Sequence, residues 1–298
     1  MKVLVPETAA GSIYDLGYRR YGGIRLGRRH AIWVLYIQSL RAVFGIGRSL
    51  SSKIGPIGLA GIAFFPAVVQ LGIAAIAPAD VEVLEPEDYN QLIEVVLAGF
   101  CAVVAPELVG RDQRTQTLSL YFSRALRRQD YALAKFAALI TGMLAITAAP
   151  QVVMFAGNGL AGNDFGDYLQ DDWTDLPRIL GSALLLSVLV ASIGLVIAAQ
   201  TPRRAYSTAG ILAAFLLTSA VGASLFEAAD RDAGRFILLM SPFHIVRGLT
   251  LWFFDASPDP GSQLAQADLP GVMYAIAATA VALLMLALLL RRYERIST

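Results

Sequence analysis

The sequence has few charged residues for its length. Only 16 % of its 298 residues are Asp, Glu, Lys or Arg, whereas soluble domains contain about 25 %. Apolar residues make up 56 % of the chain, and the mean hydropathy is +0.58. Because so few polar side chains cannot cover that much apolar surface, we expect part of it to face lipid. The composition excludes a secreted enzyme, a disordered scaffold and a soluble nucleic-acid-binding protein.

Cysteine is almost absent, and so are catalytic motifs. The single cysteine, Cys101, excludes an internal disulfide and a Cys-x-x-Cys site. It lies in an apolar run, which favours a small buried side chain over a reactive thiol. The chain has no Gly-x-x-x-x-Gly-Lys-Ser/Thr loop for nucleotide phosphates and no His-Glu-x-x-His or Gly-x-Ser-x-Gly motif. Nothing in the sequence therefore points to catalysis by this chain.

Six stretches are long and apolar enough to cross a bilayer, which takes about 20 residues of helix. Charges or turn-forming residues bound each stretch. Because a backbone in hydrocarbon must satisfy its own hydrogen bonds, we predict helices rather than strands. The stretches are Pro56–Pro78, Gln91–Val109, Leu133–Ala156, Ile179–Ala199, Ala205–Phe226 and Val272–Leu290.

Two further apolar stretches are predicted to be helical without crossing the membrane. In His30–Leu50, apolar residues recur at helical spacing, while Gln38, Arg41 and Arg48 occupy the other face. This pattern predicts an amphipathic helix in the headgroup layer. Polar residues and a proline interrupt Phe236–Phe254, which predicts a re-entrant or broken pair of short helices. The apolar face of the first stretch comprises Trp33, Tyr36, Ile37, Leu40, Val43 and Phe44, and the interrupting residues of the second are Pro242, His244, Arg247 and Gly248.

The charges are distributed unevenly along the chain. With six spans and a cytoplasmic N-terminus, all but four of the 24 Lys and Arg residues fall in cytoplasmic segments. The first two external loops are acidic instead. An excess of Lys and Arg on the cytoplasmic side is the usual orientation. The predicted fold class is an all-α integral membrane protein with six transmembrane helices and both termini in the cytoplasm. The four exceptions are Arg178, Arg231, Arg235 and Arg247.

Ionisable residues inside the predicted spans are scarce. Glu94 and Glu107 lie near opposite ends of the second span, and no span carries Lys or Arg at mid-depth. We expect Glu107 to pair with Arg111 or Arg114 on the following turns. The scarcity of buried charge disfavours an ion-coupled transporter.

The most informative segment is Glu107–Lys135, between spans two and three. Aromatic and aliphatic side chains lie there between arginines. One interpretation is an amphipathic segment that rests on anionic lipid, held by Arg124, Arg127 and Arg128. The other is a docking helix for a cytoplasmic partner. The residues alone favour neither. The apolar and aromatic residues are Leu118, Leu120, Tyr121, Phe122, Leu126 and Tyr131.

In this segment the chain resembles the membrane subunits of ABC-2-type ATP-binding-cassette exporters. The resemblance rests on an acidic residue followed by Arg-x-x-Thr-Leu, Ser-Arg and a closing Tyr and Lys. Thr201–Ala209 and Ser241–Phe243 are also similar, whereas Ala125 stands where many members have proline. The residues that carry the pattern are Glu107, Arg111, Asp112, Arg114, Thr117, Leu118, Ser123, Arg124, Tyr131 and Lys135.

For architecture, the resemblance implies three elements around the six spans. An amphipathic elbow helix would precede span one, at His30–Leu50. A coupling helix would occupy about residues 111–130, and the re-entrant segment about residues 236–254. Residues 1–54 would then form a basic cytoplasmic tail with the elbow, and residues 55–298 an ABC-2-type transmembrane domain.

For function, the resemblance implies the permease subunit of an exporter in the bacterial plasma (inner) membrane. Two permeases, identical or different, would work with two copies of a cytoplasmic ABC ATPase, among membrane lipids and without nucleic acid. ATP and Mg would bind to the ATPase, so this chain would hold no cofactor or metal and would not itself be an enzyme. The coupling helix would act as a lever that moves spans two and five at the dimer axis. A hydrophobic or amphipathic substrate would leave the cell between these spans of the two permeases.

Two other functions stay open beside that of an exporter permease. Alternatives that stay open are a non-transporting membrane anchor or assembly protein and, less favoured, an intramembrane lipid-modifying enzyme. An enzyme of that kind needs His, Asp or Glu gathered at one depth of the membrane.

The resemblance to the exporters also implies which residues couple the ATPase to transport and which contact the substrate or form the gate. The implied coupling residues are Glu107, Arg111, Arg114, Thr117, Leu118, Tyr121, Arg124, Arg127 and Arg128, and the implied substrate or gate residues are Pro242, Phe243 and His244.

Overall fold

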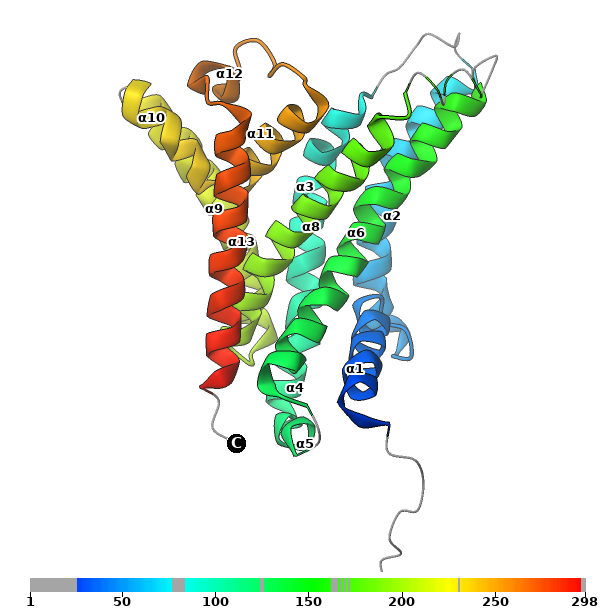
Figure 1. The fold of residues 1–298 in the computed structure, drawn as a ribbon, viewed down its shortest axis with the longest axis vertical. Coiled ribbons are helices and arrows are strands. Elements are labelled where there is room, and N and C mark those ends of the chain that lie inside the picture. Colours follow the sequence, from blue (N-terminus) through cyan, green and yellow to red (C-terminus); the bar gives the residue numbers. More distant parts are fainter. Residues whose placement is uncertain are drawn as a thin grey trace, which may run out of the picture.

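The computed structural model describes residues 26–76, 84–123, 126–161, 172–229 and 231–295, with Gly166, Tyr168 and Gln170. All regular secondary structure in these residues is helical. The long helices lie close together at one end of the molecule and splay apart toward the other (Figure 1).

Six helices are long and apolar enough to cross a membrane, as predicted, which is consistent with a multi-pass membrane protein. Each overlaps or encloses one predicted stretch. They are α2 (Leu50–Ala74), α3 (Pro86–Ala105) with its continuation, α6 (Arg128–Ala161), α8 (Asp175–Gln200), α9 (Arg204–Ala228) and α13 (Gly271–Glu294).

The second span runs further than predicted. One π-helical turn, η1 (Pro106–Gly110), joins α3 to α4 (Arg111–Arg114), so the helical rod continues to Arg114. A π turn holds one residue more than an α turn and rotates every following side chain about the helix axis. The spacing rules of an α-helix therefore do not apply across η1.

The helices differ strongly in how deeply they are buried. Most of the apolar stretch of α8 is buried (78 %), whereas the figure is 17 % for α2, α9 and α13. The core therefore lies around α8, α3 and α6. Cys101 is fully buried there and its thiol faces the carbonyl oxygen of Val190, as expected for a small structural side chain. The outer helices expose large apolar residues, among them Phe65, Leu217 and Leu283.

Helix α1 (Gly27–Val43) packs beside the first half of α6. The Tyr36 hydroxyl lies 3.0 Å from Oγ1 of Thr141. The buried residues are Leu35, Ser39 and Val43, one turn apart, and Trp33 is exposed. Val43 of the predicted apolar face is thus buried against the bundle and Trp33 is exposed, and the placement of this helix in the headgroup layer stays a prediction.

The first amphipathic helix is also shorter than predicted. It ends at Val43, because Gly45 and Gly47 take left-handed conformations with φ of +67° and +83°. Glycine adopts such conformations without the steric penalty of a side chain. Arg48 consequently lies in the turn before α2 and not on the helix.

The interrupted stretch forms two helical pieces that meet at a sharp angle. Gly234–Met240 and Pro242–Phe254 are bent by 102° relative to each other. Proline fits the first turn of a helix because its missing N–H has no partner there anyway. Pro242 therefore begins the second piece, and the stretch is a broken pair of short helices, one of the two predicted forms. The elements are α10 (Arg231–Ile237), η2 (Leu238–Met240), α11 (Pro242–Phe254) and the following α12 (Gln263–Ala267).

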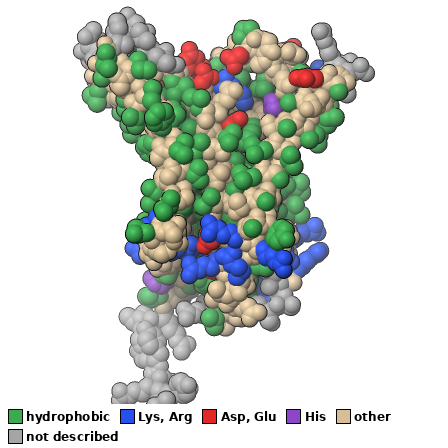
Figure 2. Space-filling model, turned by 180° about the vertical axis from the view of Figure 1, so that it is seen from behind, with side chains coloured by type: hydrophobic (Ala, Val, Ile, Leu, Met, Phe, Trp, Pro, Cys, Tyr) green, Lys and Arg blue, Asp and Glu red, His purple; other side chains and the backbone are tan. Residues whose placement is uncertain are grey.

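The two ends of the molecule carry opposite charge. Lys and Arg side chains form a belt near one end, whereas Asp and Glu side chains gather at the other (Figure 2). The basic end contains α4, α5 (Leu118–Phe122) and the last turn of α13. The acidic end contains the first turn of α3, α11 and α12.

Candidate functional site

The predicted coupling residues that the structure describes lie together at the basic end, but the described part of residues 111–130 is not one helix. The chain leaves α4 at Thr115, and Gln116 is left-handed with φ of 53°. Oγ1 of Thr115 donates to the Arg111 carbonyl at 3.0 Å, and Oγ1 of Thr117 donates to the Asp112 carbonyl at 3.3 Å. Threonine hydroxyls that bond local backbone in this way compete with helix formation. Arg124 and Ala125 are outside the described residues.

Glu107 is the centre of an ion cluster that joins three segments. Its carboxylate lies 3.3 Å from Arg48, 3.7 Å from Arg114 and 3.1 Å from Arg204. We call these four residues the Glu107 cluster. The predicted pair with Arg114 is confirmed. The Arg111 side chain has no ion pair within the described part of the chain, because the π turn rotates it away from the i+4 position.

A second carboxylate neutralises a buried lysine. Nζ of Lys135 lies 2.9 Å from Oδ2 of Asp112, and the Lys135 side chain is only 8 % exposed. The Tyr131 hydroxyl donates to the same oxygen at 2.7 Å. A buried ammonium group is costly without a counter-ion, so Asp112 holds the end of α4 against the first turns of α6.

The Tyr131 ring lies at the centre of an aromatic cluster. Its centroid is 5.6 Å from Tyr121, 6.0 Å from Phe122 and 5.2 Å from Tyr293. Aromatic rings at these separations attract one another beyond the effect of burial. The cluster connects α5 to both α6 and α13. On α5 itself, Leu118 is buried, whereas Leu120 is 65 % exposed and faces away from this cluster.

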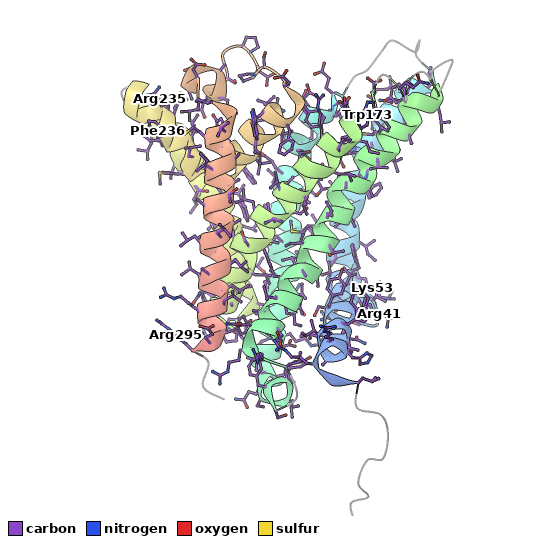
Figure 3. All side chains as sticks on the ribbon, viewed as in Figure 1. Arg41, Lys53, Trp173, Arg235, Phe236 and Arg295 are labelled. Atoms are coloured by element: carbon purple, nitrogen blue, oxygen red, sulfur yellow. The ribbon has the colours of Figure 1, made fainter. Side chains whose placement is uncertain are left out.

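Hydrogen bonds to backbone carbonyls connect further helices at the basic end. They link α4 with the turn between α8 and α9, α6 with α13, and α13 with the end of α8. Figure 3 labels Arg41, Lys53 and Arg295 at this end. The bonds are Gln113 Nε2 to Ala199 O (3.2 Å), Arg114 Nη1 to Pro202 O (3.2 Å), Arg128 Nη1 to Glu294 O (2.8 Å) and Arg292 Nε to Ala199 O (3.3 Å).

The two remaining coupling candidates lie where α6 begins. The Arg127 backbone N–H donates to Asp130 at 2.9 Å, and the Arg128 guanidinium lies 5.7 Å from the Phe122 ring centroid. Arg28 of α1 donates two hydrogen bonds to the Asp130 carboxylate, at 2.6 and 2.7 Å. These bonds raise the pKa of the Arg28 guanidinium. Apart from their charge, nothing in the sequence indicates these long-range partners.

At the acidic end the charges are reversed relative to the Glu107 cluster, because one arginine, Arg247, lies among carboxylates. Its guanidinium lies 2.7 Å from the Asp88 carboxylate and 3.4 Å from that of Asp259, and it donates to the Glu87 carbonyl at 3.0 Å. The side chain is only 9 % exposed. We call these residues the Arg247 cluster. It fixes α11 to the first turn of α3.

The predicted gate residues lie beside this cluster. Phe243 stacks on Phe215 of α9 with 5.6 Å between ring centroids. Nε2 of His244 lies 3.2 Å from Oε1 of Gln263, while its buried Nδ1 has no partner among the described residues. A cavity of about 210 Å³ brings Phe243 and His244 together with two residues that were not predicted there, Glu94 and Arg247.

The described residues contain no group of three or more His, Cys, Asp or Glu side chains that could hold a metal ion. His30 lies on α1 and His244 on α11, so the two histidines belong to opposite ends of the molecule.

No protein-family model matches the chain, and no curated protein matches it. Any functional assignment therefore rests on the side-chain arrangement at the two ends.

Proposed function

We propose that the chain is the permease subunit of an ATP-binding-cassette exporter in a bacterial plasma membrane. The basic end lies in the cytoplasm, as the excess of Lys and Arg there favours. A separate cytoplasmic ATPase, present in two copies, binds and hydrolyses ATP. A hydrophobic or amphipathic substrate moves outward between two permease subunits.

The observation that carries this proposal is the position of α5. This short helix lies at the basic end between spans two and three and exposes Leu120. Through the rings of Tyr121 and Phe122 it contacts Tyr131 of α6, which in turn contacts Tyr293 of α13. Because these rings pack against one another, a displacement of α5 is passed to two spans. An exposed docking residue on an element coupled to the spans is what a lever driven by another subunit requires.

The remaining helices are assigned to the other elements of an exporter permease. In this proposal α1 is the elbow helix, and the bent pair around Pro242 is re-entrant from the outer side. The outer faces of α2, α9 and α13 carry enough exposed apolar surface to meet both lipid and a second permease. Spans α3 and α9 move at the axis between the two permeases, either identical or different.

A membrane anchor without transport is the second candidate. It would use the exposed face of α5 to hold a partner. It would have no need of the aromatic connection from α5 to α13, and for that reason we favour the exporter.

Copurification tests the proposal. The tagged full-length chain is solubilised gently from its native membrane with an ATP analogue present, and its partners are identified by mass spectrometry. We expect a stoichiometric ABC ATPase. Leu120→Glu should lower its recovery about tenfold or more, as expected for an apolar residue at the centre of an interface. The matched control is Leu160→Glu, since Leu160 is similarly exposed (73 %, against 65 % for Leu120) but lies at the far end of α6.

Two results would contradict the proposal. If the wild-type chain recovers no ATPase, the chain is not an ABC permease. If the ATPase binds but Leu120→Glu and Leu160→Glu affect its recovery equally, α5 is not the docking element. A bound ATPase whose hydrolysis drives no substrate export in vesicles would favour the anchor.

A further inference from the structure

A cavity of about 350 Å³ lies at the basic end between α1, the α1–α2 turn, α4, α5 and α6. Sites for small molecules occupy about 300–1,000 Å³, so this cavity is large enough for a ligand. Tyr121 of the aromatic cluster forms part of its wall, and the cavity is separate from the one beside His244. No role proposed above uses it.

The charges that line this cavity are mainly positive. Among the described residues, Arg48, Arg111 and Lys135 line it, with Asp112 as the only carboxylate. Asp112 is already engaged by Lys135 and by the Tyr131 hydroxyl. Arg48 shares Glu107 with two other arginines. Burial, followed by the nearby charge of Arg111, lowers the pKa of Arg48. The cavity therefore has positive charge left without a counter-ion.

A buried hydroxyl in the same wall also lacks a partner. Ser39 is 2 % exposed and lines the cavity, and its Oγ has no hydrogen bond within the described part of the chain. A buried hydroxyl without a partner costs free energy, and an anion oxygen in the cavity would accept its hydrogen. Gln38 supplies a further amide at the rim.

The surroundings of the cavity suit a lipid. Val34, one turn before Gln38 on α1, is 42 % exposed, and Figure 2 shows a belt of Lys and Arg side chains across this end of the molecule. We expect anionic headgroups to meet the protein at such a belt. Basic pockets between membrane helices at the cytoplasmic side are a known form of anionic lipid recognition. Arginine and lysine together suit phosphate because they supply several charged donors.

We propose that this cavity binds a phosphate-bearing anion, and that its source is the headgroup of an anionic phospholipid in the surrounding leaflet. The phosphate oxygens lie between Arg111, Lys135 and the Ser39 hydroxyl. The bound headgroup bridges α1 to the segment that carries Thr117 and Tyr121. This binding does not depend on the proposed transport function.

Lipid titration of the purified full-length chain in detergent tests the site. Native mass spectrometry measures how much phosphatidylglycerol or phosphatidylcholine stays bound, and we expect tighter binding of phosphatidylglycerol. Arg111→Gln should weaken it about tenfold, the value for losing a charged hydrogen bond. Arg111 has no ion pair to lose, so this variant should fold. The matched control is Arg41→Gln, because Arg41 is an exposed arginine of α1 that does not line the cavity (Figure 3).

A second variant keeps the proposal testable on its own. Ser39→Ala should weaken phosphatidylglycerol binding several-fold without lowering the thermal midpoint of the lipid-free chain, since it removes a hydroxyl that makes no bond there. A parallel titration with inorganic phosphate separates the sources. Binding of inorganic phosphate that Arg111→Gln abolishes, without selective lipid binding, would support the phosphate site and overturn the lipid as its source. Equal effects of Arg41→Gln and Arg111→Gln, or no binding of either probe, would overturn the site.

Discussion

The two ends of the molecule use opposite charges for the same structural task. At the basic end one carboxylate, Glu107, contacts three arginines from separate segments. At the acidic end one guanidinium, Arg247, contacts two carboxylates and a backbone carbonyl. In each case the scarce charge is central and the abundant charges surround it. Removing the central residue should therefore cost more than removing any one of its partners.

The two clusters also differ in their exposure to water. The difference lies in the central side chains: Arg247 is 9 % exposed and Glu107 is 21 % exposed, whereas exposed partners occur at both ends, with Asp88 at 43 %, Asp259 at 71 % and Arg204 at 55 %. Water and salt weaken exposed ion pairs far more than buried ones. We expect the Glu107 cluster to respond to ionic strength and the Arg247 cluster to resist it.

The largest effect is expected from Asp112→Asn at the basic end. This change leaves the buried Lys135 ammonium without a counter-ion and should destabilise the folded chain by about 4 kcal/mol. The measurement is equilibrium unfolding in mixed micelles with added SDS. The control is Asp175→Asn, whose partner Arg178 is half-exposed and which should cost less than about 1 kcal/mol. Equal costs for both variants would mean that Lys135 does not need Asp112.

The second largest effect is expected from Arg247→Met. It should lower the free energy of unfolding by about 3 kcal/mol, because the central charge of the acidic end is nearly buried. In a variant whose other two tryptophans, Trp33 and Trp173, are replaced by Phe, the fluorescence of Trp252 on the same helix reports local loosening of α11. Arg178→Met removes a half-exposed arginine at the same end and is the matched control. If Trp252 responds equally in both variants, Arg247 does not anchor α11 to α3.

Glu107→Gln should cost about 2 kcal/mol, between the values for buried and surface pairs. Stability falls because Arg48, Arg114 and Arg204 repel one another once the charge of Glu107 is removed. Raising the salt concentration to about 1 M shortens the screening length to about 3 Å, so the difference from the wild type should shrink. The cost of Arg247→Met should stay constant in the same titration. A salt-independent Glu107→Gln effect would contradict the contrast between the two ends.

The features that could be predicted from the sequence are those set by apolar length and by charge excess. Six long apolar runs and the break at Pro242 were predicted, because both depend on consecutive residues. The pair of Glu107 with Arg114 was also within reach, since both lie on one helical rod. The Thr-Gln-Thr run at residues 115–117 carries the signal that ends α4, because the two threonine hydroxyls bond the local backbone.

The features that could not be predicted depend on tertiary contacts or on a local change of helix type. Arg48 and Arg204 join Glu107 only because three segments meet at the basic end. Arg111 does not pair with Glu107 as expected, because a π turn lies between them. No single residue type predicts such a turn. The face of α1 that packs on the bundle could not be predicted, because Ser39 is polar and yet lies in that contact.

The uneven burial of the spans has a consequence for how the sequence can change over evolutionary time. Most side chains in the apolar stretch of α8 are buried inside the protein, so a substitution there alters packing with several neighbours at once. Outward positions of α2 and α13, such as Phe65 and Leu283, have no fixed neighbour in the chain to match. Drift among apolar residues should therefore be rapid on those faces, and α8 should be the slowest span to diverge.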